Sequence, residues 1–152
     1  MAITLGPEEQ ELLREELAAF GALLPDAAAR ARYDAAAAAV EAGELPDEAL
    51  EPIGNLLEVG LQTGRIRKLH RAAGEQALLR LFGKTPAGQA LAAATAEVNN
   101  ALQQLDGQTI ESVRVHTRVP GTHLLMISTD ACEVTLRFAP DGVAVESIAV
   151  GV

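Results

Sequence analysis

The sequence predicts an α+β fold, with about five N-terminal helices packed on one face of a C-terminal four-stranded antiparallel meander. Apolar residues recur at helical spacing up to about Leu105, and from Thr109 they alternate as they do in strands. The helical part is also rich in alanine, the best helix former. A chain of 152 residues has the length of one ordinary domain, so we expect a single domain over 1–152, helical over 1–107 and a β-meander over 108–152.

The first two helices are bounded by prolines and a glycine. Pro7 suits the first turn of a helix, and Pro25 ends that helix. Asp26 can cap a second helix, which ends at Gly43. The buried stripe of the first helix is expected to consist of Leu13, Leu17, Phe20 and Leu24.

The third and fourth helices follow with less regular signals. The third opens at residues 46–48, and Pro52 with Gly54 predicts that it is kinked or split. The fourth covers 65–82 and stops at Gly83.

Thr85 and Pro86 are a cap and first-turn signal for the fifth helix, which Asp106 and Gly107 end. Four strands are then predicted at about 110–119, 122–129, 132–139 and 143–150. The short turns between them force neighbouring strands to be antiparallel, so the strand order should follow the sequence.

One face of this sheet should lie on the helices. Its predicted members are Val113, Val115, Leu125, Ile127, Cys132, Val134, Leu136, Phe138 and Val145. The alternation slips near Glu146 and Ser147, which predicts a β-bulge there.

Composition argues against several functions. The net charge of −9 argues against nucleic acid as a partner, and the 3% aromatic content leaves little for stacking on bases or sugars. A single cysteine, Cys132, excludes an intramolecular disulfide and a cysteine-based zinc cluster. The sequence shows neither a signal peptide nor an apolar run of about 18 residues, so we expect a cytoplasmic protein that does not span a membrane.

The chain contains only incomplete versions of known catalytic and ligand-binding motifs. Gly83-Lys84-Thr85 resembles the end of a phosphate-binding loop, but Leu78 stands where the loop needs a glycine. His116, His123 and Cys132 do not form a convergent set of three ligands, so no metal or other cofactor is expected. We therefore expect no enzymatic activity. An enzyme of unrecognised type would need one of the two histidines in a cleft beside a carboxylate.

Charge is distributed unevenly along the chain. Residues 65–84 carry six lysines or arginines and one acid, whereas residues 1–64 carry thirteen acids and three arginines. On a helical projection Arg67, Lys68 and Arg71 share one side. The main expectation is that this basic helix pairs with the acidic helices, within the chain or across a dimer. An acidic protein partner and a polyanion are the alternatives.

The outer face of the predicted sheet combines cations with large apolar side chains. The candidate partner-binding residues are Arg114, His116, Arg118, Leu124, Met126 and Arg137. This composition is typical of interfaces, although a solvated sheet face would also explain it.

These observations favour a non-enzymatic protein–protein interaction module, either an adaptor or a subunit of a larger assembly, and a homodimer in solution. The alternative is a small-ligand-binding domain with a pocket between helices and sheet, where Gly54, Gly60 and Gly64 would leave a cavity.

Overall fold

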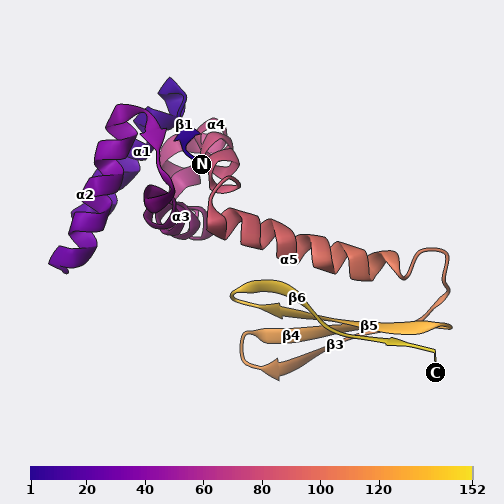
Figure 1. Cartoon of the computed structure of the whole chain (residues 1–152). Coiled ribbons are helices and arrows are strands. Elements are labelled where there is room, and N and C mark those ends of the chain that lie inside the picture. The colour runs from indigo at the N-terminus through magenta and orange to yellow at the C-terminus, as the bar shows by residue number, and fades with distance from the viewer. Residues whose placement is uncertain (152) are drawn as a thin grey trace. The chain divides into compact units, whose positions relative to one another are not determined.

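The computed structural model describes residues 1–151 and has the α+β class that the sequence predicts. Within those residues, five helices precede a four-stranded antiparallel sheet (Figure 1). The chain divides into two compact units, Met1–Gln89 and Ala90–Val152. The single domain expected over 1–152 stays a prediction.

The N-terminal unit contains four helices and a small antiparallel sheet. They are α1 (Pro7–Gly21), α2 (Ala27–Ala42), α3 (Asp47–Gln62) and α4 (Arg65–Phe82), with β1 (Ile3–Thr4) and β2 (Glu44–Leu45). Pro7 opens α1 as predicted. The carboxylate of Asp26 caps α2 by accepting hydrogen bonds from the backbone N–H groups of Ala28 and Ala29, at 3.2 and 3.3 Å. Gly43 ends α2 with a left-handed φ of 77°.

The pairing of β1 with β2 is not visible in the sequence. Ile3 pairs with Leu45 and Thr4 with Glu44, so each strand has only two residues, too few for an alternating pattern to show. The pairing ties the N-terminal segment to the connection between α2 and α3.

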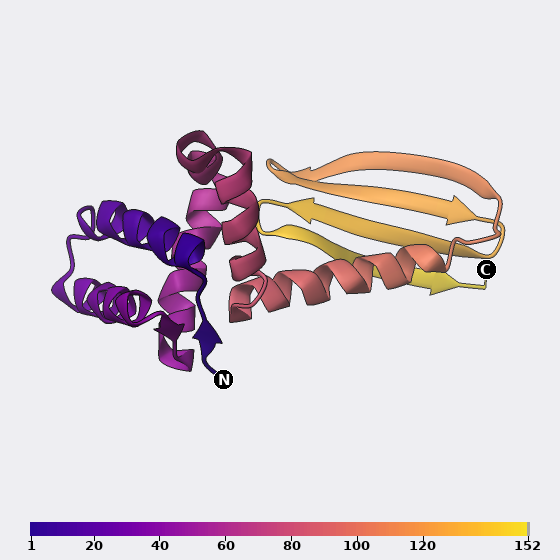
Figure 2. The same cartoon turned by 90° about the horizontal axis from the view of Figure 1, so that it is seen from above.

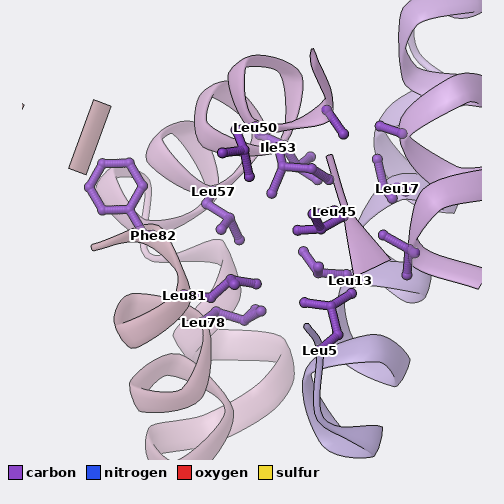
Figure 3. Close-up of a cluster of buried hydrophobic side chains, with 14 of the residues drawn as sticks. Leu5, Leu13, Leu17, Leu45, Leu50, Ile53, Leu57, Leu78, Leu81 and Phe82 are labelled. Atoms are coloured by element: carbon purple, nitrogen blue, oxygen red, sulfur yellow. The ribbon is translucent and has the colours of Figure 1, made fainter. Parts of the chain in front are cut away.

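Leucines dominate the core of the N-terminal unit, since the chain has few aromatic residues to fill it. Figure 3 shows these side chains converging from α1, α3, α4 and the short strands. Leu13, Leu45, Ile53, Leu57 and Leu78 are fully buried. Of the stripe predicted on the first helix, Leu13 and Leu17 are buried and Phe20 packs at the edge of the core. Leu24 was wrongly included, because α1 ends at Gly21 and Leu24 lies outside the core.

The irregular helix is α4 and not α3. α3 is a single helix that contains Pro52 and Gly54, both buried, so packing holds it together despite the N–H that proline lacks. α4 departs from helical geometry at Arg71, where φ is 59° and ψ is −169°. Of the two outcomes predicted for the third helix, the split is therefore wrong, because α3 is continuous from Asp47 to Gln62, and the kink stays a prediction.

The turn between α4 and α5 is tightly packed. Thr85 Oγ1 accepts a hydrogen bond from the N–H of Gly88 at 3.2 Å and donates one to the carbonyl of Phe82 at 2.7 Å. The predicted cap at Thr85 is therefore confirmed. A Cβ on Gly54 would lie 3.3 Å from Cβ of Thr85, so α3 approaches this turn closely.

The C-terminal unit is an antiparallel meander with most of α5 packed on one of its faces (Figures 1 and 2). Its elements are α5 (Pro86–Gln103), β3 (Ile110–Val119), β4 (Thr122–Thr129), β5 (Cys132–Ala139) and β6 (Gly142–Val150). The strand order β3-β4-β5-β6 confirms the predicted meander, which makes β3 and β6 the two edges.

Register in this sheet agrees with the sequence pattern. Val98 and Ala101 of α5 pack on Cys132, Val134 and Leu136. The predicted bulge is also confirmed: the pairs Thr135–Ser147 and Leu136–Val145 leave Glu146 as the extra residue in β6.

Candidate functional site

Strand pairing brings the predicted partner-binding residues together on the sheet face opposite α5. Arg114 pairs with Met126, and His116 pairs with Leu124, which in turn pairs with Arg137. Residues directly opposite each other in antiparallel strands share a face, so these five side chains belong to one surface. We call this surface, together with Arg118, the open face.

The basic residues of the open face differ in whether a carboxylate lies close to them. Arg118 Nη1 lies 2.8 Å from Oε1 of Glu146, and Arg137 is 3.8 Å from the same carboxylate and 3.5 Å from Asp141. Arg114 and His116 are exposed and make no ion pair with any residue from 1 to 151. The edge strand β3 therefore carries an arginine, Arg114, without an ion-pair partner among residues 1–151.

The face of the sheet that α5 covers is only partly buried. The predicted core-face residues do share this face, and Leu136 and Val134 are buried. The expectation that all of them are covered is wrong for Val113, Val115 and Phe138, of which Val113 is 55% and Val115 is 65% exposed. A single helix is about 10 Å wide, whereas four strands span roughly 15–20 Å, so β3 stays uncovered within this unit.

Of the basic residues predicted on α4, Arg67, Lys68 and Arg71 are all exposed. Arg67 lies 3.5 Å from Glu75 of the same helix. Within residues 1–151, Lys68 and Arg71 have no carboxylate at ion-pair distance. The pairing expected with the acidic helices is instead made by Arg65, whose Nη1 is 2.9 Å from Oε2 of Glu16 in α1.

Glu16 is the centre of a buried charged cluster that the sequence did not reveal. Its side chain is 1% exposed, and its Oε1 lies 2.8 Å from Nε2 of His70, which is 7% exposed. Arg65 contacts both carboxylate oxygens of Glu16, at 2.9 and 3.4 Å. Helical spacing could have indicated that Glu16 is buried, because Glu16 follows Leu13 by three residues and so lies on the apolar stripe of α1.

The strained backbone at Arg71 adjoins this cluster. An L-residue rarely adopts its φ of 59° with ψ of −169°, and such a conformation costs of order 1–3 kcal/mol. A Cβ on Gly74 would lie 2.4 Å from Cβ of His70, so the chain is also crowded one turn later. The absence of a side chain at Gly74 therefore leaves room for the side chain of His70, which contacts Glu16.

We expect Arg71→Gly to raise the free energy of unfolding by about 1 kcal/mol, since glycine relieves the strain at a smaller entropic cost. Urea unfolding followed by circular dichroism measures the change. Arg80→Gly is the matched control in a regular, exposed part of α4, and it should lower stability by about 1 kcal/mol. Equal losses in both variants would show that position 71 is not strained.

The glycines expected to leave a cavity instead allow close packing. A Cβ on Gly60 would lie 2.7 Å from Cδ1 of Ile66, and Thr85 fills the space at Gly54. Gly64 caps α4 with a left-handed φ of 73°. Close packing at Gly54 and Gly60 therefore leaves no room for a cavity beside either residue.

Hollows occur elsewhere, and two of them have partly apolar linings. One, of about 300 Å³, lies between α1 and α2 beside Tyr33, whose pKa is raised by burial. The Arg14–Glu41 pair at its rim lowers the pKa of Glu41 through their hydrogen bond. The other, of about 420 Å³, is an open groove between α5 and β6 beside Val145 and Ile148.

The two histidines of the sheet lie on different faces. His116 belongs to the open face, whereas His123 pairs with Phe138 on the α5 side, where its Nδ1 is 3.1 Å from Thr117 Oγ1. Cys132 is buried on the α5 side as well. Across residues 1–151, no group of three histidine, cysteine or carboxylate side chains is placed to hold a metal ion.

Comparison of the chain with protein family models, with curated proteins and with solved structures finds no match. Over the described residues, none of the helices combines the length and the hydropathy needed to cross a membrane.

Proposed function

We propose that the chain is a non-enzymatic protein–protein interaction module, an adaptor or a subunit of a larger assembly, which binds its partner through the open face. A homodimer is the solution state we propose for the isolated chain. The reduced, buried thiol of Cys132 suits the cytoplasm, where we place the protein.

One observation carries the proposal: strand pairing places two large apolar side chains, three arginines and a histidine on a sheet face that α5 does not cover. Leu124 lies between His116 and Arg137 in the pairing, and Met126 lies beside Arg114. Arginine and methionine are enriched in protein interfaces, and partly exposed leucine among them adds apolar area for a partner to bury. A merely solvated face needs neither apolar residue.

We expect Leu124→Glu to weaken association by about tenfold or more, because it places a carboxylate in the apolar centre of the open face. Native mass spectrometry of the protein, captured gently from the lysate of its own cells, reports the mass and stoichiometry of the bound chain. The wild-type chain should carry a second chain or a second copy, and the variant should lose it.

Leu23→Glu is the matched control, since Leu23 is highly exposed in the N-terminal unit. Thermal unfolding of both variants checks that the fold is retained. If the Leu124→Glu chain keeps its partner while folded, the open face is not the binding surface.

The alternative function is binding of a small ligand in the groove between α5 and β6. Its volume of about 420 Å³ lies within the usual range for ligand pockets, and Val145, Ile148 and Ala101 give it an apolar floor. An extra mass of a few hundred daltons on the wild-type chain, retained in Leu124→Glu, would favour this function.

A further inference from the structure

We infer that the β3 edge of the C-terminal sheet takes up an extended segment of a partner protein as a fifth strand, and that this segment alternates apolar and acidic residues. The inference rests on the proposed function and adds to it the chemistry of the partner.

The backbone of β3 is suited to accept another strand. β3 pairs only with β4, so alternate N–H and C=O groups along its other side have no partner strand within residues 1–151. Between its two bulges, residues 112–117 pair regularly with residues 123–128. The opposite edge, β6, has its bulge in the middle of the strand at Glu146, which interrupts the ladder there.

The two faces of β3 present different chemistry to an added strand. On the α5 side, Val113 and Val115 are more than half exposed, although they continue the rows that end on the buried Val134 and Leu136. On the open face, Arg114 and His116 are exposed and unpaired among the described residues. A strand that alternates apolar and acidic side chains would cover the valines on one face, and on the other it would pair a carboxylate with Arg114 and offer a hydrogen-bond acceptor to His116.

A second copy of this chain fits the same edge poorly. Opposite residues of an antiparallel pair share a face, so two β3 strands would place Arg114, His116 and Arg118 of both copies on one face. Like charges directly opposite each other destabilise a sheet. Charge complementarity therefore favours an acidic segment over self-pairing at β3.

The test uses the full chain and two labelled peptides, Val-Glu-Val-Glu-Val-Glu-Val and its counterpart with lysine in place of glutamate, in fluorescence anisotropy. We expect the glutamate peptide to bind about tenfold or more tightly than the lysine peptide. In the variant Arg114→Glu/His116→Glu this preference should reverse, an outcome that unfolding cannot produce. The control Gln76→Glu/Arg80→Glu makes the same change in charge on exposed positions of α4 and should leave the preference unchanged.

N-methylation separates strand addition from simple attraction between charges. Only one set of alternate peptide N–H groups faces β3 in an added strand. Of two glutamate peptides methylated on alternate residues, one should therefore bind and the other should not, whereas equal binding of both would overturn the inference.

Failure of this inference differs from failure of the proposed function. If neither peptide binds, the inference is overturned. The exposed side chains of Arg114 and His116 would then prevent another strand from pairing with β3. If Leu124→Glu still releases the native partner in that case, the open face binds without an added strand and the proposed function stands.

Discussion

Glu16→Ala should lower the free energy of unfolding of the N-terminal unit by about 3 kcal/mol, the lower end of the cost of removing one partner from a buried ion pair. The substitution leaves His70 buried without its hydrogen-bond partner at 2.8 Å and deprives Arg65 of both its contacts. Partial exposure of Arg65 keeps the loss at this lower end, because water can solvate its guanidinium. Thermal unfolding followed by circular dichroism should show a melting temperature roughly 10 °C lower or more.

Glu15→Gln is the control for this measurement, since Glu15 is an exposed neighbour whose carboxylate is 3.6 Å from the other nitrogen of His70. Its change should stay within about 0.5 kcal/mol. If the Glu16→Ala protein has the same melting temperature as the wild type, the free-energy cost of burying the carboxylate equals the stabilisation from its contacts with Arg65 and His70.

Gly88→Ala should disrupt the turn between α4 and α5 and cost about 3 kcal/mol or more. The added Cβ would lie 1.9 Å from the carbonyl oxygen of Phe82 and 2.8 Å from Cα of Gly83. Both contacts are with backbone, so no side-chain rotation relieves them, and the hydrogen bond from the Gly88 N–H to Thr85 must stretch. Urea unfolding followed by circular dichroism gives the loss in stability.

Gly21→Ala is the matched control for that substitution. Gly21 lies at the end of α1, and a Cβ there would meet nothing within 4 Å. Alanine at this position should leave stability unchanged or raise it by up to about 1 kcal/mol. If Gly88→Ala is as stable as Gly21→Ala, the turn adjusts freely and the close approach has no energetic role.

Local signals were sufficient for most of the elements. Asp26 and Gly43 mark the ends of α2, Thr85 caps α5, and the slip of alternation near Glu146 is the observed bulge. Each of these depends on residues that are near neighbours in the sequence. β1 was missed because its pairing depends on a distant segment, and the kink was missed because no glycine marks the positive φ at Arg71.

The candidate surfaces also include features that local sequence patterns predict and features that depend on tertiary contacts. Alternation alone placed Arg114, Leu124 and Arg137 on one sheet face, and the register agrees. How much of the opposite face is covered could not be predicted, because that depends on where α5 lies across four strands. The cluster around Glu16 joins α1 to α4, and no spacing within either helix indicates its ion pairs.

The pairing of Ile3 with Leu45 also sets an order of events in time. Each hairpin of the meander joins strands that are neighbours in the sequence, and it closes within about 1–10 μs once both strands have been made. The partner strand of β1, in contrast, follows it by about 40 residues, which takes about 2–8 s at ordinary rates of translation. During that interval Ile3 and Leu5 have neither a partner strand nor the core of the N-terminal unit to join, so this segment stays exposed to solvent between its synthesis and its folding.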